Sequence, residues 1–206
     1  MKKIKFFLDP FNNLEPWLND MAKRGYRLES INNFIYDFEK TNESFRYSTQ
    51  FIGANTYADN KQYTQLLQEC SARVFHAPIN QGSIVLGKIK FRPYARGSGK
   101  LANSLSGYNK EILVVENAGD KIQHLLTNAA DISIEYRDIR NAYLQATVMM
   151  TLLLGYKIYK MYMSNFEIRN TLLSVLVFIV WIILLVLLNK AQSNYQMYKS
   201  ESDLME

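Results

Sequence analysis

An uncharged run of eighteen residues, from Thr171 to Leu188, constrains this chain more than any other feature. Leu, Ile, Val and Phe dominate the run, and Arg169 and Lys190 bracket it. A helix rises about 1.5 Å per residue, so the run and its flanks reach across a hydrocarbon core of about 30 Å. A buried helix of a soluble protein is the alternative, but soluble helices normally keep a polar face. We therefore predict a transmembrane helix.

The segment before this run is ambiguous. Residues 142–156 carry no charge but are too short to span alone, and extension to Met163 brings in Lys157 and Lys160. Lysines near the end of a span can snorkel to the interface. We favour a helical hairpin with spans at about 142–163 and 171–188, and the alternative is one span at 171–188 with the earlier helix on the membrane surface or under the preceding domain. Flanking Lys and Arg give each topology only a marginal bias.

The start of the chain does not resemble a signal peptide. Lys2, Lys3 and Lys5 precede only three apolar residues before Asp9-Pro10, whereas the apolar part of a signal peptide needs about 7–15 residues. We therefore expect the N-terminal domain to be cytoplasmic. The first 170 residues carry 22 basic and 16 acidic side chains, a net charge of +6, which favours anionic lipid or acidic partners.

Residues 1–93 predict an α+β domain. Apolar side chains at helical spacing predict helices at 13–24 and 59–70. Alternating or aromatic runs predict an antiparallel meander at 26–52 and further strands at 3–8, 72–77 and 83–91. The order helix, strand, turn, strand occurs twice, so we predict two α-β-β units that share one antiparallel sheet with helices on one face, a ferredoxin-like fold.

The rest of the chain divides by its hydropathy into three segments. Residues 94–140 predict a loop, a strand at 111–116 and helices that lead to the membrane. Residues 141–190 predict the transmembrane hairpin, and residues 191–206 predict a polar, acidic and frayed tail.

Five basic side chains fall within thirteen residues that contain no acid: Lys88, Lys90, Arg92, Arg96 and Lys100. On one strand the first three would share a face. We predict one exposed basic surface that contacts anionic lipid headgroups or an acidic protein surface. The alternative is a solvated outer strand whose charges discourage edge pairing. Nucleic acid has only composition in its favour and is not expected, and the residues around Gly97 and Gly99 lack the spacing of a nucleotide-binding loop.

The sequence predicts no catalytic residues, no metal site and no cofactor, because no nucleophile, carboxylate pair or ligand spacing stands out. His76 is predicted to be a packed or surface histidine, and Cys70 a core residue on the apolar face of its helix. Five aromatic residues of the meander are predicted to form the core or, as the lesser alternative, a pocket for an apolar ligand: Tyr36, Phe38, Phe45, Tyr47 and Phe51.

Three motifs carry a family resemblance: Trp17-Leu18 in the first helix, the strand start at 25–28 (Gly-Tyr-Arg-Leu), and the next strand at 36–40 (Tyr-Asp-Phe-Glu-Lys). With Arg92-Pro93 after the second unit, this pattern resembles the DUF2812 family of bacterial membrane proteins of unknown function. Residues 72–75 lack the Gly-Trp that the family usually carries there. The resemblance covers roughly residues 3–93 and the hydrophobic C-terminus. It implies paired transmembrane helices in a bacterial cell membrane and a PadR-like regulator as protein partner, and the family has no established catalytic residues to carry over to this chain.

Together these features predict a non-enzymatic, membrane-anchored sensory or regulatory binding module with a cytoplasmic α+β domain. Ligand or protein binding to that domain would be coupled to the hairpin. The alternatives are a membrane-associated enzyme acting on lipid and an accessory protein that packs against another membrane protein.

Overall fold

The computed structural model describes residues 1–70, 72–79, 84–103, 110–119, 125–126, 128–163 and 168–204. The chain divides into two compact units. The α+β unit comprises Met1–Asn80 and Val85–Asn128, and the hairpin unit comprises Gln81–Ile84 and Ala129–Glu206. The α+β unit therefore extends well beyond the predicted boundary at residue 93, because a strand at Ile112–Ala118 lies in the middle of one of its sheets.

Helix α1 spans Pro10–Lys23. It begins three residues before the predicted start, because the Asp9 side chain accepts a hydrogen bond from the backbone N–H of Asn12 and Pro10 occupies the first turn, where a missing N–H does no harm. Gly25, with a φ of 77°, follows the helix end, where glycine adopts the left-handed conformation without strain. The apolar face of α1 buries Leu14, Leu18 and Met21.

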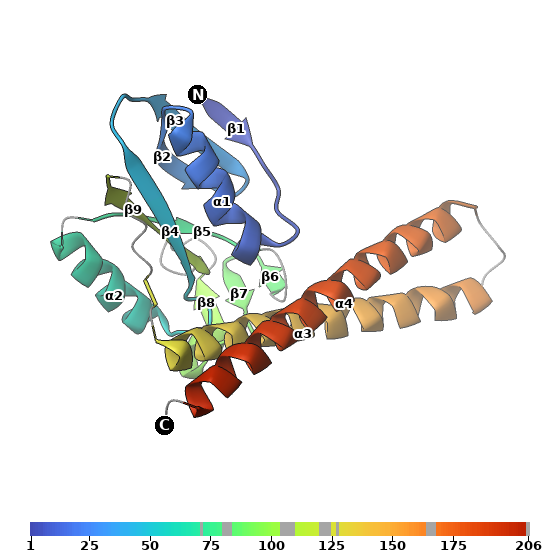
Figure 1. Ribbon diagram of the computed structural model, residues 1–206. Coiled ribbons are helices and arrows are strands. Elements are labelled where there is room, and N and C mark those ends of the chain that lie inside the picture. Colours follow the sequence, from blue (N-terminus) through green and yellow to red (C-terminus); the bar gives the residue numbers. More distant parts are fainter. Residues whose placement is uncertain are drawn as a thin grey trace. The chain divides into compact units, whose positions relative to one another are not determined.

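Three strands form the first sheet, in the order β1-β3-β2. They are β1 (Lys2–Ile4), β2 (Tyr26–Asn32) and β3 (Ile35–Lys40), all paired antiparallel. Trp17 of α1 packs edge-on against Tyr36 and Phe38 of β3, with ring centroids 4.9 and 5.6 Å apart. Figure 1 shows α1 lying across this sheet, so one face of the sheet is covered by the helix.

The predicted meander is wrong at its third strand. Strand β4 (Phe45–Phe51) does not continue from β3 but belongs to a second antiparallel sheet, β4-β9-β5, with β5 at Arg73–Ala77 and β9 at Ile112–Ala118. Side chains of α1 meet the backbone of β4 instead: Asn19 bonds to Tyr47, and Glu15 Oε2 accepts the N–H of Thr49 at 2.8 Å. These bonds use backbone groups of β4 that face away from β9.

Helix α2 (Tyr57–Glu69) begins with a capping box between Thr56 and Asp59. It ends before Cys70, which is exposed, so the prediction that Cys70 is a core residue is wrong. The third sheet consists of short strands in the order β6-β7-β8: β6 (Ile84–Leu86), β7 (Ile89–Phe91) and β8 (Leu101–Asn103), the last preceded by the 3₁₀ turn η1 (Gly97–Lys100).

The α+β class is thus confirmed, with three small antiparallel sheets among the described residues. The single ferredoxin-like sheet is not confirmed, since the two predicted α-β-β units pair differently: β2 with β3, and β5 with β9. The prediction that the meander aromatics form the core is confirmed, because none of the five exceeds 8 % exposure: Tyr36, Phe38, Phe45, Tyr47 and Phe51. A second cluster joins Ile52, Leu113 and Val115.

The hairpin unit consists of two long helices, α3 (Ala129–Met163) and α4 (Ile168–Asp203), which run antiparallel (Figure 1). Residues 164–167, between the two predicted spans, lie outside the described residues, as do residues 120–124 and 127 of the segment predicted to lead to the membrane. The prediction of a frayed tail is wrong, because α4 remains helical to Asp203. The ring of Tyr198 stacks on that of Tyr136, with ring centroids 5.4 Å apart. By length and composition, α4 from Thr171 is the one described helix that could cross a membrane, and only 11 % of its apolar window is buried.

Candidate functional site

The five predicted basic residues do not share one exposed face. The strand predicted at 83–91 is interrupted by a turn at Gly87 and Lys88, where Gly87 has a φ of 59°. Lys88, Arg96 and Lys100 are exposed, whereas Lys90 is 8 % and Arg92 0 % exposed. The predicted exposed surface is therefore wrong for Lys90 and Arg92, since each has a partner inside the α+β unit.

Lys90 pairs with a carboxylate that sequence reasoning missed. Its Nζ contacts Glu111 Oε1, and the Glu111 side chain is 0 % exposed. Glu111 Oε2 also accepts the N–H of Ile79 at 3.0 Å. The backbone of Glu111 bonds to Ala77 and Ile52, so this residue ties the ends of β4 and β5 to β9. The one signal in the sequence is that Glu111 opens an otherwise apolar strand run.

Arg92 lies just after β7 and lines a cavity. Its Nε and Nη2 donate to the carbonyl oxygen of Gly99 at 3.1 and 2.9 Å, and its N–H donates to the carbonyl of Lys100 at 2.8 Å. Only glycine fits at position 99, because a Cβ there would lie 2.7 Å from the carbonyl oxygen of Asn55. The guanidinium therefore folds the η1 turn back onto β7.

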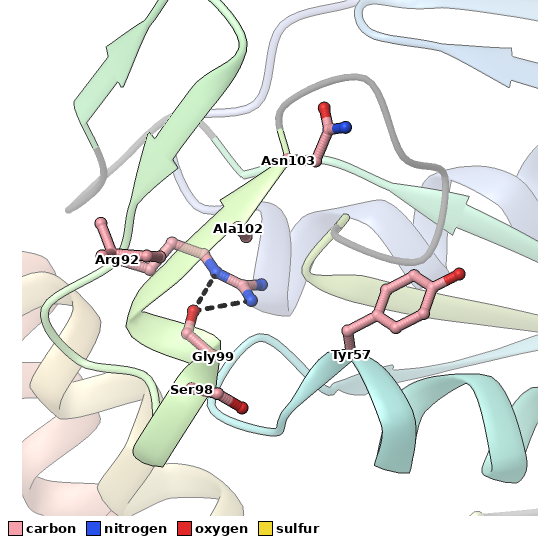
Figure 2. Close-up of a pocket in the computed structure, with 7 residues that line it drawn as sticks. Tyr57, Arg92, Ser98, Gly99, Ala102 and Asn103 are labelled. Carbon is pink, nitrogen blue, oxygen red and sulfur yellow. Dashed lines mark hydrogen bonds between the residues drawn. The ribbon is translucent and has the colours of Figure 1, made fainter.

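The cavity has a volume of about 330 Å³. Figure 2 shows the Arg92 guanidinium extending toward Gly99, with Tyr57 of α2 on the opposite side. Arg92 is the one charged residue among the described residues that line it: Tyr57, Arg92, Ser98, Gly99, Leu101, Ala102 and Asn103. The other described lining residues are uncharged, so the positive charge of Arg92 favours binding of an anionic group in the cavity, since buried charges are only weakly screened.

Tyr94 follows Arg92 by two residues and is buried, at 8 % exposure. Burial raises the pKa of Tyr94 well above its ordinary value, and the charge of Glu111 raises it further while Arg92 partly offsets this. Its hydroxyl has no hydrogen-bond partner in the structure as described. Tyr94 is therefore a neutral phenol at physiological pH.

A second polar cluster surrounds Glu116 of β9, in a cavity of about 140 Å³. Arg27 Nη2 lies 2.7 Å and Arg73 Nη1 3.7 Å from Glu116 Oε1, and the Tyr47 hydroxyl donates to Oε2 at 3.2 Å. The hydrogen bond to Glu116 is the main cause that raises the pKa of Arg27. Glu43 and Glu29 pair with the same two arginines. These charges neutralise one another, so the cluster is a structural tie between β2, β5 and β9.

His76 is packed against Thr64, which agrees with the first of its two predicted environments, packed or at the surface. Its Nε2 lies 3.1 Å from the Thr64 hydroxyl, which donates its hydrogen to the carbonyl of Asn60 at 2.7 Å. The Thr64 oxygen must therefore accept, and His76 Nε2 carries the proton. Burial, with a smaller contribution from the charge of Lys110, lowers the pKa of His76 to about 4. Neutral imidazole is the form that this site holds.

Metal-ligating side chains do not gather within the part of the chain that the structure describes: no three His, Cys, Asp or Glu residues come together there. The described clusters are instead ion pairs between opposite charges, at Glu111 and at Glu116.

Comparison with known proteins gives one match. No curated protein and no solved structure matches the chain. A family model described as a protein of unknown function, DUF2812, matches residues 11–148. The match begins in α1, after β1, covers the rest of the α+β unit and ends within α3, before α4. It includes the Arg92 cavity, the Glu116 cluster and the resemblance motifs. The chain therefore belongs to the DUF2812 family, whose function is not known.

Proposed function

We propose that this protein is a membrane-anchored, non-enzymatic binding module of the bacterial cell membrane, whose cytoplasmic α+β unit takes a small anionic ligand in the Arg92 cavity. The observation that carries the proposal is the cavity itself. It is about 330 Å³ in volume, within the range of small-molecule sites, and a fully buried arginine is its one charged residue among those described. That charge would attract a carboxylate or phosphate group into the cavity.

Membrane anchoring is supported by the exposure of α4. A core helix of a soluble protein is mostly buried, whereas only 11 % of the apolar window of α4 is buried by the rest of the chain. An exposed apolar surface of that length is stable only against lipid or another apolar partner. We therefore place α4 in the bilayer.

The pairing of α3 with α4 supports the proposed two-span topology. Trp181 Nε1 donates to Thr151 Oγ1 at 2.9 Å, and Arg140 Nη1 donates to Gln192 Oε1 at 3.2 Å. Because the helices are antiparallel, a step of nine residues forward along α3 matches a step of nine residues back along α4. From Thr151 and Trp181 these steps lead to Lys160 and Leu172, which therefore lie at about the same level of the helix pair. If residues 171–188 cross the bilayer, the packed α3 must lie at the same depth, with Lys160 at the outer end of the span.

Exposed side chains of α3 fit this placement. A band of apolar residues faces outward over the length that would lie in lipid: Leu144, Val148, Leu152, Leu153, Ile158 and Met161. Lys157 and Lys160 come within the last turns of that band and can reach the headgroups. Both termini would then lie on the cytoplasmic side. The PadR-like partner implied by the family resemblance stays a prediction, as does coupling of binding to the hairpin.

The ligand proposal is tested on the full chain in detergent or nanodiscs. Thermal unfolding is followed while inorganic phosphate, acetate or citrate is added at constant ionic strength, with chloride as the reference anion. We expect a saturable rise in the unfolding temperature with at least one of these anions, because a ligand that binds only the folded state stabilises it.

Two variants make the test specific to the cavity. Ala102→Phe places a large side chain in the cavity wall and should abolish the saturable rise. Lys88→Gln removes a positive charge from an exposed turn outside the cavity and should leave the rise unchanged. The proposal is wrong if none of the anions gives a saturable response, or if Ala102→Phe responds as the parent does. Conversion of a bound anion into product would favour the enzyme alternative.

A further inference from the structure

The α+β unit exposes a small apolar patch at one end of its first sheet. Ile4 of β1 is 81 % exposed, and Phe6, just beyond it, is 55 % exposed. Phe34 and Ile35, at the turn between β2 and β3, are 39 % and 38 % exposed. We call these four residues the N-terminal patch. Single exposed apolar side chains are common, but a contiguous group marks an interaction site.

The residues of the N-terminal patch lie next to one another. Ile4 is directly opposite Ile35 in the antiparallel pairing of β1 with β3, and the rings of Phe6 and Phe34 are 5.6 Å apart. Residues opposite each other in such a pair project from the same face. The neighbouring Tyr36 projects from the other face, against Trp17 of α1. Ile4 and Ile35 therefore project from the face that α1 does not cover.

Three lysines flank the patch: Lys2 shares the face of Ile4, whereas Lys3, opposite Tyr36, and Lys5 lie toward the face that α1 covers. Lys2, Lys3 and Lys5 are all exposed and alternate with or flank Ile4 and Phe6. Lys5 Nζ also lies over the rings of Phe7 and Trp17, at 5.6 and 5.4 Å from their centroids. The acidic residues of this face stand farther from the turn, where Asp37 is opposite Lys2 and Glu39 opposite Arg27. The turn end of the sheet is thus apolar and aromatic, with lysines on the adjacent edge strand.

We infer that the N-terminal patch is a docking surface for an anionic lipid bilayer. Aromatic and aliphatic side chains flanked by lysine suit the membrane interface, where the rings enter the headgroup region and the ammonium groups contact lipid phosphates. The inference rests on the proposed membrane anchoring, which keeps a bilayer near the α+β unit at high effective concentration. The patch would hold the α+β unit against the lipid that the hairpin crosses.

The charge of the lysines favours a lipid bilayer, and not a second copy of this chain, as the partner that docks on the patch. β1 is the edge strand of its sheet and only three residues long. Two copies paired through this edge would bring six lysines together, and lysine on an edge strand acts against such pairing. An anionic surface complements the same lysines.

The test uses the full chain in nanodiscs that hold one copy each. In a Cys70→Ser background, Phe6→Cys carries a small fluorescent label, and a lipid with a quencher high on its acyl chain reports contact. We expect several-fold stronger quenching in discs rich in phosphatidylglycerol than in phosphatidylcholine discs, and a loss of that difference at high salt. Phe34→Cys, labelled in the same way, should behave alike.

Two further label positions separate the possible failures. A label at Leu66→Cys, on the exposed side of α2, should stay unquenched in both lipids. A label at Ile179→Cys in α4 should be quenched in both lipids, because it reports anchoring alone. If position 179 is not quenched, the anchoring proposal fails. The docking inference is overturned if the label at position 179 is quenched and the label at position 6 is not. It is also overturned if the label at position 6 is quenched no more than the label at position 66. Equal quenching in both lipids, or no loss when all three lysines become Gln, overturns it as well.

Discussion

Asn19 of α1 holds Tyr47 of β4 through two hydrogen bonds to its backbone. Asn19 Nδ2 donates to the Tyr47 carbonyl at 2.9 Å, and Asn19 Oδ1 accepts the Tyr47 N–H at 2.8 Å. Both residues are buried, Tyr47 at 0 % exposure and Asn19 at 9 %. A side-chain amide thus takes the place of a neighbouring strand, so β4 can leave β3 and pair with β9. Without it, two buried backbone groups would have no partner.

Asn19→Ala should therefore destabilise the protein by about 2–3 kcal/mol, because buried backbone donors and acceptors without partners each cost about 1–3 kcal/mol. Denaturant unfolding of the α+β unit within the full chain measures the change. Asn13→Ala on the exposed side of the same helix is the matched control, and it should stay within about 0.5 kcal/mol of the parent. Equal effects of the two substitutions would show that the Asn19 bonds do not hold β4.

Lys90→Met should cost about 3–5 kcal/mol, because it leaves the buried carboxylate of Glu111 without its cation. Lys88→Met, two residues away on the exposed turn, should have little effect. The double variant Lys90→Met/Glu111→Gln should recover part of the loss, since Gln removes the unpaired charge and can still accept the N–H of Ile79. A double-mutant cycle by denaturant unfolding checks this, and strictly additive losses would contradict the pairing.

His76 should make stability depend on pH in the acid range. Its pKa is lowered to about 4 in the folded state from 6.5, so between these values the unfolded chain binds the proton and the folded chain does not. Stability from this residue is complete above pH 6.5 and is lost as the pH falls through 4, by about 3 kcal/mol at most. His76→Gln removes this contribution. The parent should lose more stability than the variant between pH 7 and pH 4, and parallel pH curves for the two would contradict the assignment.

The hairpin topology predicts the side of the membrane on which the chain ends. A fluorescent protein fused after Glu206 should be fluorescent in bacterial cells, and alkaline phosphatase fused there should be inactive, because both termini are cytoplasmic when α3 and α4 both cross. The reverse pattern would mean that α4 crosses alone. In that case α3, which contacts α4 through Thr151 and Arg140, would have to separate from it.

The sequence by itself determined the features that arise from near neighbours. Apolar spacing predicted α1 and α2, and the alternating and aromatic runs within 26–52 predicted the pairing of β2 with β3. The charge-free run at 171–188 predicted an apolar helix long enough to span, which α4 is. Each of these depends on side chains only a few positions apart, so periodicity and turn chemistry are enough to indicate them.

Only the tertiary structure decided which distant groups meet. Phe45 pairs with Ala118, Lys90 with Glu111 and Arg27 with Glu116, all across long stretches of chain. A strand edge offers the same N–H and C=O groups to any partner, so the sequence of β4 could not exclude β3 in favour of β9. Likewise, a lysine on a strand reads as exposed until a buried carboxylate is placed beside it. The basic cluster was therefore visible in the sequence, and the burial of Lys90 and Arg92 was decided by Glu111 and Gly99, which only the fold brings to them.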